Sequence, residues 1–145
     1  MPELIGIARA PRILEKLEEL VSANVTIESG IEGDARGKKR KRQVTILFED
    51  DWIKACEELR SKLDWKTRRA NLYVRGIKGP QKENSVIQIG KVKLKINFET
   101  DPCDIMDKQK IGLKNALTPE WRGGVCCSVV EGGKIKLCDK VYLET

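Results

Sequence analysis

An alternation of apolar and polar residues marks the clearest predicted strand of the chain. Apolar side chains occupy the even positions from 92 to 98, and lysine or asparagine lies between them. Such a period of two places one face of a strand on a core and the other in solvent. Asp101-Pro102-Cys103 follows, and proline lacks a backbone donor, so pairing should stop as Cys103 is presented. Cys103 is therefore a candidate site, with a small buried structural cysteine as the alternative.

Shorter runs of the same kind predict that most of the chain is extended. The predicted strands are 4–8, 21–28, 43–48, 67–76, 125–130, 135–137 and 141–143. Gly90-Lys91 and the segment Glu131-Gly132-Gly133 are the predicted hairpin turns. The conformation of residues 12–20 is left open, because a helical face over residues 14–21 conflicts with the strand alternation that begins at Val21.

Two segments show helical spacing instead. The first follows Asp50 or Asp51, either of which can cap a helix, and its predicted core face is Ile53, Cys56, Leu59 and Leu63. Cys56 is therefore predicted to be structural. The second is a short helical segment that stops before Pro119, with its apolar side formed by Ile105, Met106, Ile111, Leu113 and Leu117.

Composition limits the chemistry. A length of 145 residues fits one domain, and 28 Lys plus Arg against 22 Asp plus Glu give a net charge of +6, which favours an anionic ligand or partner. The chain has no histidine, which excludes Ser-His-Asp and Cys-His catalysis and imidazole acid or base chemistry. Five cysteines, with no secretory signal or long apolar run, predict free thiols in a reducing cytoplasm.

The cysteine spacing does not predict a zinc site. Cys126 and Cys127 are adjacent, so in a strand they must point to opposite faces and cannot chelate one metal together. Cys138 lacks a CxxC partner.

Two basic clusters are candidate anion sites. Residues 38–42 are five consecutive cations, which are most simply a solvated loop and alternatively an RNA or phosphate contact. The run lacks the stacking aromatics that single-stranded nucleic-acid platforms use. Arg68, Arg69 and Asn71 open the predicted strand 67–76, where a planar guanidinium could hold an oxyanion in bidentate fashion. A solvated strand edge is the alternative there.

Seven short motifs occur in the order found in one known family. They are GIEGD at 30–34, RQVTILFED at 42–50, TRRANLYVRGI at 67–77, IGKVKLKI at 89–96, PC at 102–103, RGGV at 122–125 and GGKIKLCDKV at 132–141. Together they resemble the MOSC domain family, named for the C-terminal domain of molybdenum cofactor sulfurase, from about Gly30 to the end. The resemblance implies a stand-alone, single-domain member over residues 1–145. It also implies a mainly β fold, a closed or partly open β-barrel with a few short helices, similar to MOSC and pyruvate kinase barrels.

The same resemblance implies a role in sulfur or molybdenum cofactor handling. Cys103 falls on the family cysteine thought to carry transferred sulfur as a persulfide, and in amidoxime-reducing relatives to ligate molybdenum. Arg68, Arg69 and Asn71 fall on cofactor-holding positions, and Arg42 joins them as a candidate cofactor-binding residue. Arginine suits the phosphate of a pterin, and a thiolate suits sulfur or a soft metal. Nearby cations would favour that thiolate.

We therefore expect a small cytoplasmic protein that carries sulfur on Cys103, binds the molybdenum cofactor (molybdopterin), or does both. The expected partners are a cysteine desulfurase or other sulfur donor and a molybdoenzyme or other cofactor acceptor, without a membrane. Whether the chain is an enzyme stays open, with sulfur transfer expected in place of independent redox catalysis. Many members carry a histidine after the GD turn, where this chain has Ala35-Arg36-Gly37. Two alternatives remain: a nucleic-acid-binding module using residues 38–42, and an enzyme acting on a small anion.

Overall fold

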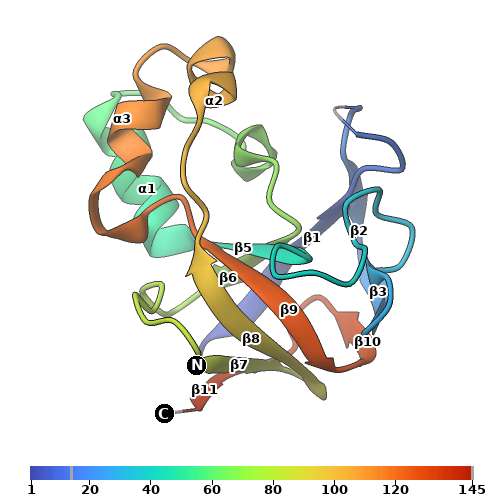
Figure 1. The fold of residues 1–145 in the computed structure, drawn as a ribbon. Helices are drawn as coiled ribbons and strands as arrows, with labels where there is room; N and C mark the ends of the chain where they lie inside the picture. The colour runs from blue at the N-terminus through green and yellow to red at the C-terminus, as the bar shows by residue number, and fades with distance from the viewer. Residues whose placement is uncertain (14, 145) are drawn as a thin grey trace.

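The computed structural model describes residues 1–13 and 15–144, and shows a mainly β protein with a few short helices. Within this part of the chain, eleven strands form two sheets (Figure 1). The larger sheet has eight strands, in the order β11 (Val141–Glu144), β7 (Val86–Ile89), β8 (Val92–Glu99), β9 (Val125–Glu131), β5 (Val44–Phe48), β6 (Leu72–Arg75), β1 (Glu3–Arg9) and β2 (Glu18–Leu20). The smaller sheet has the order β10 (Gly133–Lys136), β3 (Ser22–Thr26) and β4 (Gly30–Ile31).

The larger sheet curves into a partly open barrel. Neighbouring strands in it pair antiparallel except β5 and β6, which run parallel. The two ends of the strand order also approach each other. Glu3 at the start of β1 forms an isolated bridge with Lys140, just before β11. The backbone N–H of Leu4 also donates to the carbonyl of Asp139 at 2.9 Å. These contacts bring β1 beside the start of β11 without a continuous strand ladder, so the predicted barrel is confirmed in its partly open form.

Two hydrophobic clusters lie on opposite faces of this sheet. Alternation within β5 shows the division, because Phe48 belongs to the aliphatic cluster formed by both sheets, whereas Leu47 belongs to the cluster beneath the helices. The helices are α1 (Glu49–Glu58), α2 (Asp104–Gln109) and α3 (Leu113–Leu117), with short 3-10 turns η1 (Trp65–Arg68) and η2 (Pro119–Trp121). Figure 1 shows α1, α2 and α3 gathered on one side of the β structure.

Most predicted elements are confirmed. The strand in 92–98 is β8, it turns at Gly90-Lys91, and its pairing ends at Glu99, before Cys103. The predicted hairpin turn at 131–133 is wrong, because β10 leaves the larger sheet and pairs with β3. The predicted strands at 4–8, 21–28, 43–48, 125–130, 135–137 and 141–143 correspond to β1, β3, β5, β9, β10 and β11. Within the open segment 12–20, residues 18–20 form β2, and Leu14 lies outside the described residues.

The prediction for α1 is wrong in its cap and at Ile53, whereas Leu59 and Leu63 pack against the cluster beneath the helices as predicted. The helix begins at Glu49, and Phe48 at its N-cap makes no side-chain capping bond, so neither Asp50 nor Asp51 is the cap. Ile53 is 45% exposed, because the core face is rotated toward Trp52, Ala55 and Cys56. The predicted burial of Cys56 is confirmed.

The predicted strand 67–76 is wrong in its first half. Residues Trp65–Arg68 form η1, and the side chain of Asp64 accepts a hydrogen bond from the backbone N–H of Lys66 at its start. Arg69 ends the turn with a left-handed φ of 62°, so strand β6 begins only at Leu72. The capped turn overrides the β-type pattern and directs Arg68 inward.

The helical segment at 105–117 divides into α2 and α3. Leu113 and Leu117 are buried as predicted, but Ile111 lies between the helices and is 87% exposed. No helix in the described part of the chain combines the length and the apolar character needed to cross a membrane.

Candidate functional site

The predicted site residues converge on one hollow of about 100 Å³. Its wall is built by the loop after β4, the start of β5, the turn after η1, and the segment between β8 and α2. All five residues proposed from the sequence line it, namely Arg42, Arg68, Arg69, Asn71 and Cys103. Residues far apart in the sequence therefore place a thiol, guanidinium groups and an amide around one cavity.

Arg68 is the buried centre of this wall, being only 5% exposed. Its Nε donates to the carbonyl of Gly123 at 3.1 Å, and its Nη2 donates to the carbonyl of Thr100 at 2.9 Å. Nη1 lies 3.6 Å from the sulfur of Met106. These contacts use three of the five guanidinium N–H donors and leave two. The alternative of a solvated strand edge is therefore wrong for Arg68, because η1 turns the side chain into the protein.

The charge of Arg68 is not balanced by an acid. Among the described residues, none of the carboxylates lies within ion-pair distance of it. Burial, followed by the positive charge of Arg42, lowers the pKa of Arg68 to about 10. A buried charge is costly unless it is paired, so this cavity favours an anion.

Gly123 packs closely against Thr100, so the carbonyls of both residues can accept hydrogen bonds from Arg68. A Cβ at Gly123 would lie 2.6 Å from the carbonyl oxygen of Thr100 and 3.1 Å from Nη2 of Arg68. Only glycine lets the segment before β9 approach the end of β8 so closely. The RGGV motif thus has a local physical reason.

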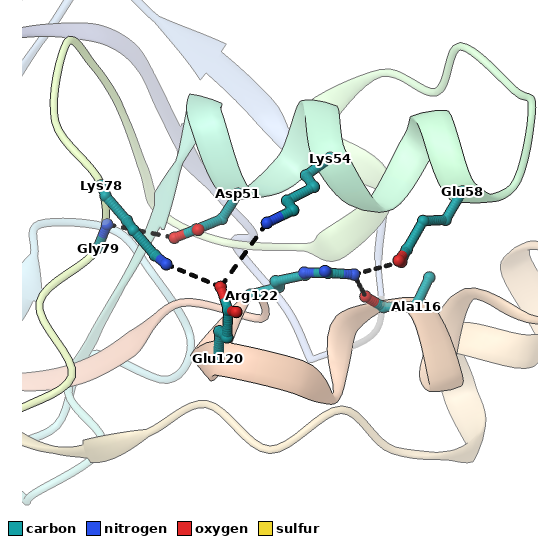
Figure 2. Close-up of polar contacts among 8 residues, drawn as sticks. All are labelled: Asp51, Lys54, Glu58, Lys78, Gly79, Ala116, Glu120 and Arg122. Carbon is teal, nitrogen blue, oxygen red and sulfur yellow. Dashed lines mark hydrogen bonds and ion pairs between the residues drawn. The ribbon is translucent and has the colours of Figure 1, made fainter.

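A network beside Gly123 fixes this segment to α1 (Figure 2). Arg122 is buried, and its Nη1 donates to Glu58 of α1 and, at 3.1 Å, to the carbonyl of Ala116 in α3. On the other side, Lys78 and Lys54 both contact the carboxylate of Glu120, at 2.7 and 3.8 Å. The helices therefore hold the residues that precede Gly123.

A buried acid in Figure 2, Asp51, joins α1 to the loop after β6. Asp51 accepts a hydrogen bond from the backbone N–H of Gly79 at 3.2 Å. Burial raises the pKa of Asp51 above 3.8, although the Gly79 bond opposes the shift. Asp51 therefore connects elements of the fold and lies away from the hollow.

Asn71 and Arg69 also have bonds within the protein. The Oδ1 of Asn71 accepts from the backbone N–H of Thr45 at 3.1 Å, and its Nδ2 donates to the carbonyl of Ala8 at 3.2 Å. Arg69 is half-buried and donates from Nη2 to the carbonyl of Glu15 at 2.6 Å. Both residues line the hollow, but the Asn71 side chain mainly connects β1 to β5, one residue before β6 begins.

Cys103 is exposed at the rim of the hollow, immediately before α2. Its backbone is extended, with φ of −124° and ψ of 177°, and its carbonyl accepts from the N–H of Met106 at 2.9 Å. The predicted presentation of this thiol after a strand end is confirmed. The alternative of a buried structural cysteine is wrong for this residue.

The other thiols differ in exposure. Cys126 and Cys127 point to opposite faces of β9 as predicted, with Cys127 in the core and Cys126 beside the hydroxyl of Thr100 at 3.2 Å. Burial raises the pKa of both thiols. Cys138 is exposed but is not among the residues that line the hollow. In the described part of the chain, no cluster of acidic or cysteine residues could hold a metal ion.

Sequence reasoning missed Arg36 and Gln43, which also line the hollow. Arg36 lies two residues after the GIEGD turn, and its position between that motif and the basic run was the available signal. Gln43 is buried, and its amide nitrogen donates to the carbonyls of Ile27 and Gly37 at 2.7 and 3.0 Å. Nothing in its local sequence marks this role.

Comparison with known proteins decides the family. The sequence matches the MOSC domain family over residues 33–142, which is most of the chain and includes most of the residues that line the hollow. The chain belongs to the MOSC domain family. A search of curated protein sequences found no match.

Solved structures share the MOSC fold seen here. The YUAD protein from Bacillus subtilis superposes with a TM-score of 0.80 at 18% identity, over 99% of this chain and 96% of that one. YiiM from Geobacillus stearothermophilus gives 0.76 at 12% identity, over 100% and 76% of the two chains. YiiM from Escherichia coli gives 0.73 at 14% identity, over 99% and 70%. At these identities the likeness concerns the fold alone.

Proposed function

We propose that this MOSC protein uses the hollow to carry sulfur on Cys103, to bind the molybdenum cofactor, or to do both. The observation that supports the proposal is the buried guanidinium of Arg68, which forms no ion pair with any described residue, in the same cavity wall as the exposed thiol of Cys103. An anionic group would offset the cost of the buried charge. A ligand with a phosphate at one end and a sulfur or metal at the other would therefore match both Arg68 and Cys103.

The residues present fit that cofactor in kind. Arg42 and the two remaining N–H donors of Arg68 would hold a phosphate, since guanidinium groups form charge-assisted bonds with phosphate oxygens. Cys103 would supply a thiolate ligand. The cofactor, when bound, supplies a pterin with a phosphate and a soft metal centre. The hollow of about 100 Å³ encloses only part of such a ligand, and a second hollow adjoins it.

Sulfur carriage requires only the thiol and a donor. The Cys103 thiolate would attack the outer sulfur of a donor persulfide, forming a new S–S bond while the donor cysteine leaves as thiolate. The step moves one sulfur atom without net oxidation or reduction. A cysteine desulfurase fits the donor role, and a molybdoenzyme or other cofactor acceptor would take the product. The proposal includes a cytoplasmic location, where free thiols persist.

Sulfur transfer is tested with a cysteine desulfurase and L-cysteine, followed by peptide mapping under non-reducing conditions. We expect the added sulfur on Cys103, and we expect Cys103→Ser to abolish it. Cys138→Ser is the matched control, because Cys138 is also exposed but does not line the hollow. Sulfur found on Cys138 or on a buried cysteine, with Cys103 unmodified, would contradict the assignment.

A further inference from the structure

The hollow continues into a second one of about 450 Å³ whose walls are strongly basic. Its lining residues are Ile13, Ala35, Arg36, Lys38, Arg40 and Arg42. Arg36 and Arg42 line both hollows, so they mark the junction between the two. Four cations and no acid therefore surround the second hollow.

The base of this basic loop is fixed by buried contacts. A Cβ at Gly37 would lie 1.8 Å from the carbonyl oxygen of Ser29, so the loop can approach the turn between β3 and β4 only with glycine. The buried amide of Gln43 holds the carbonyl of Gly37 and accepts from the backbone N–H of Val129 at 2.9 Å. The N–H of Ala35 donates to the carbonyl of Ala10 at 2.8 Å. The cations at 36 to 42 therefore extend from an anchored loop.

These cations have no acidic partners. Among the described residues, none of the lysines and arginines from 36 to 42 forms an ion pair. Among the described residues that line the first hollow, Asp34 is the one acid, and its carboxylate accepts from the N–H of Ala10 at 2.9 Å. Like charges that converge on a concave surface raise the local concentration of anions.

We infer that the two hollows together bind a ligand with two linked anionic groups, of the diphosphate class. One group would lie beside Arg68 in the first hollow, and the second would lie at the junction within reach of Lys38 and Arg40. The inference rests on the proposed function and specifies its ligand as larger than a monophosphate. A single-stranded nucleic acid fits less well, because such ligands need stacking aromatics and neither hollow is lined by one.

The test compares inorganic phosphate with inorganic pyrophosphate by isothermal titration calorimetry at constant ionic strength. We expect wild-type protein to bind pyrophosphate about tenfold tighter, equal to about 1.4 kcal/mol. The double variant Lys38→Gln/Arg40→Gln should lose most of this preference while phosphate binding changes little. Lys62→Gln/Lys82→Gln is the control, because it removes the same charge at two exposed lysines that do not line either hollow.

Equal affinity for the two probes, no binding of either, or equal losses in both double variants would overturn the inference. Tight binding of a single-stranded RNA oligonucleotide that requires Lys38 and Arg40 and weakens steeply with salt would also overturn it, in favour of nucleic acid. Failure here is distinguishable from failure of the proposed function. If sulfur still loads on Cys103 but the protein shows no preference for pyrophosphate, the proposed function stands and only the inferred second anionic group of the ligand is wrong.

Discussion

The guanidinium of Arg68 donates to the main-chain carbonyl of Thr100 at 2.9 Å, three residues before Cys103. This bond ties the end of β8 to the turn η1, and Arg68 also holds Gly123 before β9. The same side chain that would face an anionic ligand therefore positions the segment that presents the thiol. Its roles in folding and in binding should be measured separately.

We predict that Arg68→Ala destabilises the fold, whereas Arg69→Ala has a smaller effect. Loss of Arg68 leaves two buried carbonyls without their donor, at about 1–3 kcal/mol for each unsatisfied group, and the relief of one buried charge offsets part of this. A net loss of about 1–3 kcal/mol is expected. Arg69 makes one bond from a half-buried position, so about 0.5–1.5 kcal/mol is expected there. Urea unfolding measures both.

Unchanged stability in Arg68→Ala would contradict this structural role and would support a purely ligand-binding arginine. Arg68→Lys distinguishes the contributions further. Lysine keeps the positive charge but cannot reach both carbonyls with a planar fork, so it should remain less stable than wild type.

Thiol reactivity should follow exposure. Limited alkylation at neutral pH is expected to modify Cys103 and Cys138, because both are exposed, and to spare Cys56, Cys126 and Cys127. Burial raises the pKa of these three thiols and removes them from solvent. Inorganic phosphate should slow the reaction of Cys103 only, with Cys138 as the internal control. Peptide mapping that finds Cys126 modified first would argue against this site.

Short-range sequence patterns predict where the strands lie, but they do not predict the environment of each side chain as well. Alternation at 92–98 and the proline before Cys103 place that residue correctly, because both signals act within a few residues. The inward turn of Arg68 depends on a cap at Asp64 and on acceptors at Thr100 and Gly123. These contacts form only in the folded chain, so the pattern at 67–76 shows a strand where a turn occurs.

The same distinction applies to the helices and to the hollow. α1 starts at Glu49 because β5 leads directly into it, and the resulting rotation buries Trp52 and exposes Ile53. Family motifs bring Cys103 and Arg68 to one cavity, but they indicate no role for Arg36, which lies between two motifs, or for Gln43, which lies inside one. Their roles depend on a loop anchored by contacts with distant strands.

Gln43 should be essential to the position of the basic loop. Gln43→Leu removes an amide that bonds the carbonyls of Ile27 and Gly37 and the N–H of Val129. We expect a loss of about 2–4 kcal/mol in stability, because several buried polar groups lose their partner. Gln43→Glu is a partial control, since it keeps the acceptor and loses the donor. A fully stable Gln43→Leu variant would show that the loop does not need this anchor.

Asp51 should make stability depend on pH in a defined direction. Folding raises the pKa of Asp51 above 3.8, so the folded state binds this proton more tightly than the unfolded chain. The stabilising contribution is complete below pH about 3.8 and is lost as pH rises through the folded-state pKa. Asp51→Asn keeps an acceptor for Gly79, so its stability relative to wild type should increase across that window.

Asp50→Asn is the matched control, because Asp50 lies in the same first turn but is exposed. Chemical unfolding at several pH values gives the comparison. A relative stability of Asp51→Asn that decreases with rising pH would mean that the ionised carboxylate is favourable beside Lys78 and Gly79.

Mass spectrometry of the protein purified without oxygen tests the central claim most directly. Native spectra report ligands bound non-covalently, and denaturing spectra report sulfur attached to cysteine. We predict a phosphate-bearing pterin that is lost on denaturation, or one additional sulfur atom on Cys103. Cys103→Ser should abolish the added sulfur, Arg42→Gln should reduce the bound pterin, and Cys138→Ser should change neither. Wild-type protein that carries neither species, even after exposure to cysteine desulfurase and the pterin cofactor, would contradict the account.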